Sequence, residues 1–222
     1  MPQINVSKKG YITGSTESNQ VAARDASSGT HVDATGNESI AIQWFRSSGR
    51  GGGSFRYKRT FLYFDTSGVT GTVSSCTLKV SGYSNTGGDV IGVKSTAFGG
   101  DGATNLADDD FNNITWGTVY TNQLETWSTS DTNDFTLTAA ALTDIKNNDY
   151  FIIALVEHDS DYADVDTGDG HWSSGVNFGG TLQLDYTLAP TGYGNDINGV
   201  SSSNISKVKG VATANIEKVI GV

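Results

Sequence analysis

The strongest constraint on the fold is a succession of short runs rich in Val, Ile, Tyr, Phe, Trp and Thr, each bounded by Gly, Asn, Asp or Ser. β-branched and aromatic residues suit pleated strands, and the bounding residues favour turns. Because almost no helical pattern separates these runs, they favour an antiparallel sandwich or jelly roll over alternating strands and helices. The predicted strands are residues 39–46, 57–66, 75–83, 89–96, 114–120, 134–138, 150–158 and 181–188.

Two segments refine this all-β prediction. "YFIIALVE", residues 150–157, is almost continuously apolar, which predicts a central strand covered on both faces. "TAAALTDIKNND", residues 138–149, begins with a capping Thr138 and predicts one short corner helix. Residues 5–14 are expected to add a hairpin, and Trp44, which alternates with Ile40 and Ile42, is expected in the core.

The 222 residues suffice for one sizeable core plus an appendage. We predict an N-terminal arm or first hairpin (1–38), a β-sandwich domain (39–188), a linker (189–196) and a repeat tail (197–222).

The chain is acidic, with 14 Lys and Arg against 24 Asp and Glu and a formal charge of −10. Nucleic acid is therefore not an expected partner, because polyanion binding relies on Lys and Arg. A local cationic window is interpreted as a solvated strand face, with a phosphate site as the alternative; it contains Arg46, Arg50, Arg56, Lys58 and Arg59. No apolar run reaches 18 residues, and the first residues lack the apolar region of a signal peptide, so neither a membrane protein nor a secretory substrate is expected.

The chain lacks the sequence motifs of several common catalytic sites. The glycine cluster at 47–59 lacks the lysine of a Walker loop and is expected to be a flexible loop between two strands. G-x-S-x-G, H-E-x-x-H and C-x-x-C are absent, and the three histidines are scattered along the chain. Cys76 alternates with Leu78 and Val80, which indicates a buried strand position. We therefore expect a protein that is not an enzyme.

The most chemically suggestive stretch is residues 157–175, "EHDSDYADVDTGDGHWSSG". Clustered carboxylates suit a hard cation, and Tyr or Trp rings can stack on a sugar, so calcium and glycan binding are both candidates beside a merely solvated acidic loop. Asp159, Asp161 and Asp164 are the candidate ligands of a structural Ca²⁺ ion, the one cofactor considered. The full set of candidate ligand-binding residues is Asp159, Asp161, Tyr162, Asp164, Asp166, Asp169 and Trp172.

The chain ends in an eleven-residue repeat, in which Asn-Ile-x-Lys-Val recurs at 204–208 and 215–219. Eleven residues make three helical turns and predict one apolar stripe, but glycines at 199, 210 and 221 favour a short turn or a single helical turn per repeat. The units cannot bury themselves, so either they dock on something or the terminus is frayed. The candidate assembly residues are Ile205, Val208, Val211, Ile216, Val219 and Val222.

"RTFLYFDTSGVTGTVSSCTLKVSGY" resembles the signature of DNRLRE-type β-sandwich domains and their carbohydrate-binding-module-like relatives. The similarity continues through "ETWSTSDTNDFTLTAAALTDI" and "YFIIALVEHDSDYADV" and covers roughly residues 59–186, although the DNRLRE hexapeptide itself is absent. The whole chain also resembles structural proteins of tailed bacteriophages, particularly marine ones, which combine an "INVSKKGYI" opening, this sandwich and a closing "NISKVKGVATANIEKVIGV" repeat.

The resemblance implies a component of the virion surface, such as a tail-fibre or adhesin module or a capsid decoration protein, and it implies no catalytic residue. Its expected location is the virion, after synthesis in the host cytoplasm. The expected partners are other virion proteins and copies of itself, as a homotrimer or an array, with a host-surface glycan as a further candidate. A carbohydrate-binding module is the alternative function, with exposed aromatic rings expected among Trp116, Trp127, Tyr162 and Trp172.

Overall fold

The computed structural model describes residues 1–49, 52–189, 207–208 and 211–212. Within them the chain is mostly antiparallel β-sheet with a few short helices, so the predicted all-β, sandwich-like fold with a short helix is confirmed. By contact, the chain divides into a unit of Met1–Thr187 and a unit of Leu188–Val222. No helix among the described residues combines the length and the apolar character needed to cross a membrane.

The elements up to the end of the sandwich are β1 (Gln3–Asn5), β2 (Lys8–Gly14), α1 (Gln20–Arg24), β3 (Gly29–Asp33), β4 (Asn37–Gly49), β5 (Gly52–Asp65), β6 (Val73–Asn85), β7 (Val90–Ser95), η1 (Phe98–Gly100), η2 (Asp108–Asn112), β8 (Ile114–Val119), β9 (Thr132–Thr136), α2 (Ala139–Asn147), β10 (Tyr150–Glu157), η3 (His158–Tyr162), β11 (Gly170–Asn177) and β12 (Leu182–Leu188). Here η1 and η2 are 3₁₀ turns, and η3 is a single π-helical turn.

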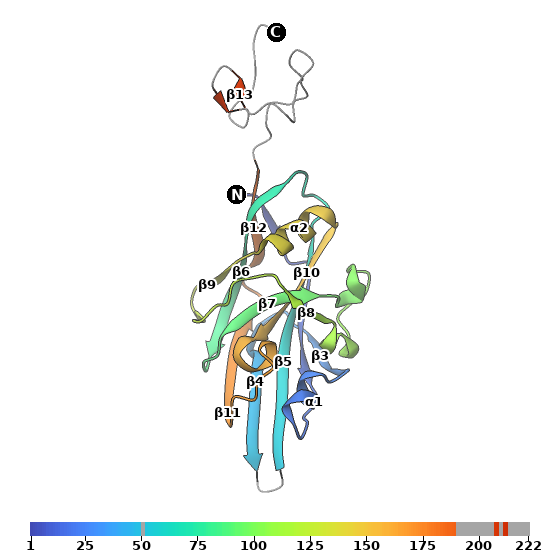
Figure 1. The fold of residues 1–222 in the computed structure, drawn as a ribbon, viewed down its shortest axis with the longest axis vertical. Helices are drawn as coiled ribbons and strands as arrows, with labels where there is room; N and C mark the ends of the chain where they lie inside the picture. The colour runs from blue at the N-terminus through green and yellow to red at the C-terminus, as the bar shows by residue number, and fades with distance from the viewer. Residues whose placement is uncertain (50–51, 190–206, 209–210, 213–222) are drawn as a thin grey trace. The chain divides into compact units, whose positions relative to one another are not determined.

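The strands follow the order β1-β12-β6-β11-β4-β5-β10-β7-β8, with β2 on β5, β3 on β2 and β9 on β6. Lys58 of β5 pairs with Thr13 of β2 on one side and with Gln43 of β4 on the other. Two residues further along, Thr60 pairs with β2 and β10. Because a strand has only two edges, β4 and β10 must occupy the same edge of β5 in succession. Figure 1 shows β4 and β5 continuing as a long hairpin beyond the neighbouring strands.

Two apolar cores lie on opposite faces of the central strands. The first core joins β5 and β10 to the layer of β6, β9 and β12, through side chains such as Leu62, Phe135 and Leu184. The second core covers the other face of the same strands with α1, the η segments and their loops, through side chains such as Phe61 and Phe111. The fold therefore has a sheet on one side of its central strands and short irregular segments on the other.

The central strand was predicted correctly. Seven of the eight residues of β10 are buried, and they alternate between the cores. Phe151, Ile153 and Leu155 lie in the first core, and the residues between them lie in the second. Trp44 is 1% exposed, which confirms its predicted place in the core.

The corner helix is also confirmed, as α2. Its first turn is capped by the Thr138 side chain, which accepts a hydrogen bond from the Ala141 N–H. Ala141 and Ile145 are buried in the first core. The basic Lys146 lies in the last turn, where its positive charge interacts favourably with the helix dipole.

The glycine cluster at residues 47–59 is not the flexible loop that was predicted. β4 continues to Gly49 and β5 starts at Gly52, and Ser47 pairs with Ser54 across the hairpin. Only residues 50 and 51 between these strands lie outside the described residues. The strands extend because Phe55 is buried in the second core and its backbone pairs with Glu17, which gives the glycine-rich segment a partner.

The hairpin predicted at residues 5–14 is also wrong. β1 pairs with β12, whereas β2 pairs with β3 and β5. Between them the Val6 N–H donates to Leu182, and the Ser7 N–H donates to Tyr63, so the chain crosses from one layer of the sandwich to the other. A strand that changes layers closes the first core at its edge, which a local hairpin would not do.

In the second unit, β13 (Lys207–Val208) pairs antiparallel with β14 (Val211–Ala212). Val208 stands opposite Val211, so a helical turn at these two assembly residues is wrong, in keeping with the strand preference of valine. The other predicted assembly residues, Ile205, Ile216, Val219 and Val222, lie outside the described residues.

Candidate functional site

The acidic segment begins at the end of β10 with a buried carboxylate. Glu157 is 2% exposed, and its side chain accepts the N–H groups of Asp159, Ser160 and Asp161 at 2.9, 2.8 and 3.2 Å. These bonds cap η3 and fix the direction in which the segment leaves the sheet. Burial raises the pKa of Glu157 to about 7, although the three N–H groups act in the opposite direction.

Asp161 turns into the protein and forms a bidentate ion pair with Arg59, at 2.8 Å for Nε to Oδ2 and 2.7 Å for Nη2 to Oδ1. Both side chains are 0% exposed. The rest of the guanidinium donates to the backbone carbonyls of Phe111 and Arg24, at 2.8 and 2.7 Å. Arg59 also lies over the rings of Phe111 and Trp116, at 4.0 and 4.8 Å from their centroids. The Arg59 guanidinium thus has a partner for each of its nitrogen atoms, and Asp161 is taken up by this buried ion pair. The pair is a structural contact, and Asp161 is not available as a metal or sugar ligand.

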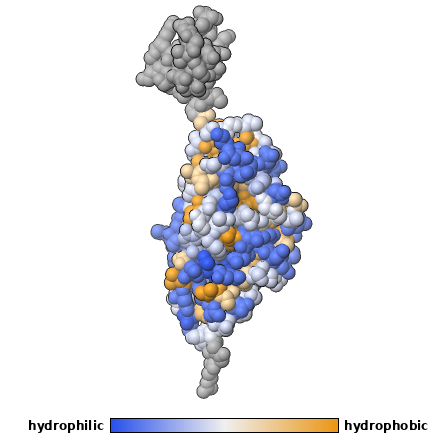
Figure 2. Space-filling model, turned by 45° about the vertical axis from the view of Figure 1, so that its right-hand side comes forward, coloured by the Kyte–Doolittle hydropathy of each residue, from blue (hydrophilic) through white to orange (hydrophobic). Residues whose placement is uncertain are grey.

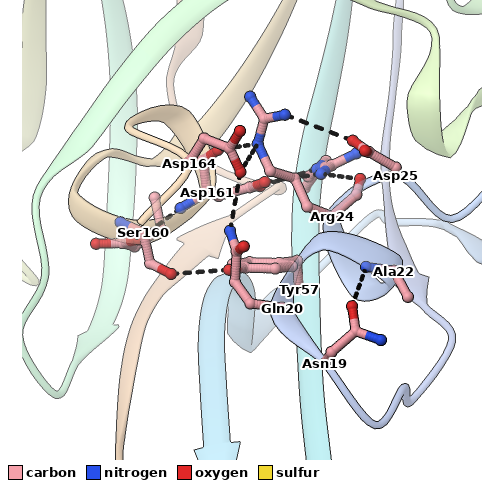
Figure 3. A network of polar contacts seen from close by, with 11 residues as sticks. Asn19, Gln20, Ala22, Arg24, Asp25, Tyr57, Ser160, Asp161 and Asp164 are labelled. Atoms are coloured by element: carbon pink, nitrogen blue, oxygen red, sulfur yellow. Dashed lines mark hydrogen bonds and ion pairs between the residues drawn. The ribbon is translucent and has the colours of Figure 1, made fainter. Parts of the chain in front are cut away.

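Further polar contacts join α1 to the acidic segment (Figure 3). Arg24 donates through Nε to the Asp161 carbonyl at 2.7 Å and lies 4.1 Å from the centroid of the Trp116 ring. Gln20 donates to Asp164 at 3.2 Å. On the strand below, the Tyr57 hydroxyl is 2.8 Å from that of Ser160. Asp164 is thereby tied to α1 rather than to the other aspartates.

Asp166 and Asp169 lie against the β4–β5 hairpin. Arg46 approaches them with Nη1 2.8 Å from Asp166 and Nε 3.3 Å from Asp169, and Ser48 donates to Asp169. Their carboxylates therefore hold the segment on the face of β4 that carries Arg46.

The proposed calcium ligands are not brought together as a set. Asp161 is committed to Arg59 and Asp164 is bonded to Gln20, while Asp159 contacts His158 at 2.9 Å. Within the described ranges, the acidic and histidine side chains that do converge are Asp89, His158 and Asp159, whose nearest ligand atoms lie within 4.8 Å of one another. The calcium ion itself stays a prediction.

Trp172 lies on β11 beside this group and is 42% exposed. Its side chain rests on Gly87 and Gly88, where an added Cβ would come within 2.8 and 2.9 Å of it. Both glycines have positive φ, at 107° and 89°, so a side chain is disfavoured at either position for two reasons. Asp89 follows directly, and the His158 N–H donates to its carbonyl at 2.8 Å. We call Trp172, Gly87, Gly88, Asp89, His158 and Asp159 the indole site.

The other predicted aromatic candidates have different surroundings. Tyr162 stacks on His158 with ring centroids 5.6 Å apart, at the edge of the indole site. Trp116 is stacked against Arg24 and Arg59, and Trp127 is 7% exposed and donates to the Gly175 carbonyl at 3.0 Å. These two tryptophans are thus part of the packing.

Cys76 is buried as predicted, and burial raises the pKa of its thiol to about 12. A thiol held in its protonated form is a poor nucleophile.

Two features of the site were not predicted from the sequence. The segment after residue 169 was taken for loop, yet β11 starts at Gly170 and carries Trp172 into the sheet. Asp89 meets His158 and Asp159, about 70 positions away, and the two preceding glycines meet Trp172, about 85 positions away. A register shift between Ser174 and Val176 interrupts the alternation along β11, so the period-two signal of this strand is weak in the sequence.

No protein-family model matches the chain. A comparison with curated proteins likewise returns no match. Function is therefore inferred from the residues, their geometry and the resemblance stated above.

Replacing Arg59 by Met should lower the free energy of unfolding by about 3–5 kcal/mol, because it leaves the Asp161 carboxylate buried without its partner. Arg46→Met is the matched control, since its partners Asp166 and Asp169 have side chains 40% and 51% exposed; it should cost at most about 1 kcal/mol. Urea unfolding followed by circular dichroism measures both. Equal losses for the two variants would contradict the anchoring role of Arg59.

Glu157 should make the protein less stable as the pH rises from about 4.5 to 7. Its folded-state pKa, about 7, lies above the ordinary 4.5, so the folded state binds a proton that the unfolded state has released across this window. The stabilisation is complete below the ordinary pKa and is lost as the pH passes the folded one. Thermal unfolding of the wild type and Glu157→Gln between pH 4 and 8 isolates the effect, because Gln cannot titrate. Parallel pH profiles for the two proteins would rule it out.

Proposed function

We propose that this chain is a non-enzymatic structural protein of a bacteriophage virion, either a tail-fibre or adhesin module or a capsid decoration protein. The observation that carries the proposal is the eleven-residue repeat, which belongs to a unit separated by contact from the sandwich. The resemblance to structural proteins of tailed phages supports the same class, because it includes the opening, the sandwich and the repeat.

The sandwich supplies its own cores. The buried apolar residues of both clusters come from the chain between Tyr11 and Leu184. On the face shown in Figure 2, hydrophilic residues predominate and hydrophobic ones form small separate patches. Within the described residues, both cores are thus formed by side chains of the first unit.

The β13–β14 strand pair in the first repeat supports association with a further strand. Among the described residues, β13 and β14 form a sheet of two strands, which alone is at best marginally stable in water and would be stabilised by the addition of further strands. A second copy offers the same segment, and so does the next repeat of the same chain, which has the same Asn-Ile-x-Lys-Val pattern. Strand addition between copies gives a homotrimer or an array, the form expected of a fibre or decoration protein.

The full chain should be oligomeric in solution, and a chain that ends at Leu188 should be monomeric. Val208→Asp/Val211→Asp in the full chain should also give monomers, because two carboxylates would face each other across the strand pair. Ser27→Asp/Ser130→Asp adds the same charge at exposed sandwich positions and should leave the oligomer intact. Mass photometry distinguishes these results, and monomers in all four samples would count against assembly through the tail.

The virion location is tested separately by mass spectrometry of density-purified particles of a phage that encodes this chain. Recovery of the protein at a stoichiometry comparable to known structural proteins supports the proposal. Its presence only in the lysate supernatant would overturn the virion location, whatever the oligomeric state.

A second candidate function, glycan binding, is favoured by the indole site. A half-exposed indole held rigidly against two glycines offers a stacking surface, and the adjacent carboxylates and imidazole can bond to sugar hydroxyls. Such a module needs no catalytic group.

Trp172→Ala should abolish binding to any glycan that the wild type retains on an array, while Trp172→Phe should keep part of it, because a smaller ring still stacks. Val21→Ala, at a 56% exposed apolar position on α1, is the control for a lost surface side chain and should bind as the wild type does. Array binding that survives Trp172→Ala would exclude the indole site as the binding surface.

A further inference from the structure

A cavity of about 180 Å³ lies between α2, the end of β7 and the start of β10. Its lining includes Lys94 and Ser95 of β7, Asp144 of α2 and Tyr150 of β10. Thr96 also lines the cavity and is exposed, so the cavity is reached from solvent. Among the described residues that line it, none belongs to the indole site. We call this space the α2 cavity.

The polar contacts in the cavity wall hold one carboxylate in a fixed direction. The Lys94 ammonium donates to Oδ2 of Asp144 at 2.8 Å, and the Tyr120 hydroxyl donates to the same oxygen. The Tyr120 ring is buried and stacks on Phe151 with ring centroids 4.9 Å apart, so the hydroxyl is held in place from the core side. Burial raises the pKa of Tyr120, and the hydrogen bond to Asp144 raises it further, so the hydroxyl remains a donor.

These contacts leave part of the wall open to a ligand. Asp144 Oδ1 accepts no hydrogen bond from the described residues, and Lys94, which has three N–H donors, donates only to Asp144 among them. The Asp144 and Lys94 side chains are 25% and 36% exposed, so both are accessible. Asn148, at the end of α2, also lines the cavity, and its side-chain amide has no partner in the described part of the chain.

The two charges of this wall compensate each other. Partial burial raises the pKa of Asp144, but the hydrogen bonds from Lys94 and Tyr120 and the charge of Lys94 lower it overall, so the carboxylate stays ionised. An anion placed on Lys94 would be repelled by the Asp144 carboxylate, and a cation placed on Asp144 would be repelled by Lys94. The wall therefore favours a polar ligand without net charge.

A ring with adjacent hydroxyl groups matches these open positions. Each hydroxyl is both a donor and an acceptor, so one of two neighbouring hydroxyls can donate to Asp144 Oδ1 while the next accepts from Lys94 Nζ. A cavity of about 150 Å³ is large enough for benzene, so the α2 cavity, at about 180 Å³, holds one six-membered ring. Tyr150 and Phe151 contribute apolar surface to the lining, against which the C–H groups of a sugar ring can pack.

We propose that the α2 cavity binds a single neutral sugar ring through two neighbouring hydroxyls, one on Asp144 and one on Lys94. Because the ion pair and the Tyr120 hydroxyl already fix the carboxylate, little ordering is needed when the sugar binds. The inference rests neither on the indole site nor on a virion location, since the cavity uses other residues and needs no second copy of the chain.

An NMR chemical-shift titration of the isotope-labelled full chain tests the proposal with D-galactose, D-glucose, D-mannose and L-fucose. A ligand of about twelve non-hydrogen atoms binds such a site with a Kd on the order of 1 mM, so the titration extends to about 50 mM. At least one sugar should shift the amide signals of Lys94, Asp144 and Asn148. Cyclohexanol, which has a single hydroxyl, and the anion D-galacturonate should bind about tenfold more weakly or less. Absence of shifts with all the neutral sugars, or equal binding of cyclohexanol or galacturonate, would overturn the proposal.

Thr96→Trp should abolish binding of that sugar, because the added indole fills the cavity. Thr126→Trp adds the same side chain at an exposed position outside the lining and should bind within about twofold of the wild type. Asp144→Asn keeps the shape of the wall and should weaken binding about tenfold, the effect of a lost charge-assisted hydrogen bond. Thermal unfolding of each variant checks folding. Trp172→Ala should leave binding unchanged; binding that survives Thr96→Trp, or that is lost in Trp172→Ala, would contradict the assignment to the α2 cavity.

Discussion

The Arg59–Asp161 ion pair holds the outer face of the central strands. That face is covered by short helical segments and loops. The Arg59 guanidinium reaches the carboxylate of η3, the Phe111 carbonyl of η2 and the Arg24 carbonyl at the end of α1. Three segments distant in the chain are thereby fixed to one side chain of β5. Because a charge at 0% exposure is tolerable only with full compensation, all three must be in place together.

The same ion pair decides the roles of the surrounding acidic residues. With Asp161 directed inward, the segment that follows is led past α1, where Asp164 is bonded to Gln20, and onto Arg46 of β4. It then enters the sheet as β11, which presents Trp172 on one face and His171 on the other. The indole site is therefore positioned by this buried contact, although it does not include it.

Sequence patterns predicted what depends on local periodicity. The apolar run of β10, the Thr138 cap of α2 and the alternation from Cys76 to Val80 each depend on nearest neighbours, and each was confirmed. Trp44 is buried as predicted, but it lies in the second core, whereas Ile42 lies in the first. The candidate site could not be predicted in the same way. Whether an aspartate binds a ligand, caps a helix or forms a buried ion pair depends on the side chains that surround it in the fold. The partner of Asp161, Arg59, is 102 residues away in the sequence.

The basic residues of the cationic window also show that the role of a charged side chain depends on partners distant in the sequence. A one-residue step along β5 separates Arg59, which is fully buried, from Lys58, which faces the opposite side. Period-two alternation could have separated these faces once the strand was known. Which of the two faces has aspartates beside its cations depends on the path of the acidic segment. That path is set by the tertiary contacts of η3.

The two proposed roles strengthen each other through multivalency. A few polar contacts on an open strand face give a weak site, since there is little enclosed surface to exclude water. If the repeat joins several copies, each further contact with a repetitive polysaccharide becomes intramolecular, and avidity can exceed single-site affinity by about 10²–10⁴ without any new interaction. Spacing of the sites then matters more than their individual strength. A weak glycan site is thus compatible with firm attachment only in the assembled form, which would link the sandwich to the repeat in function.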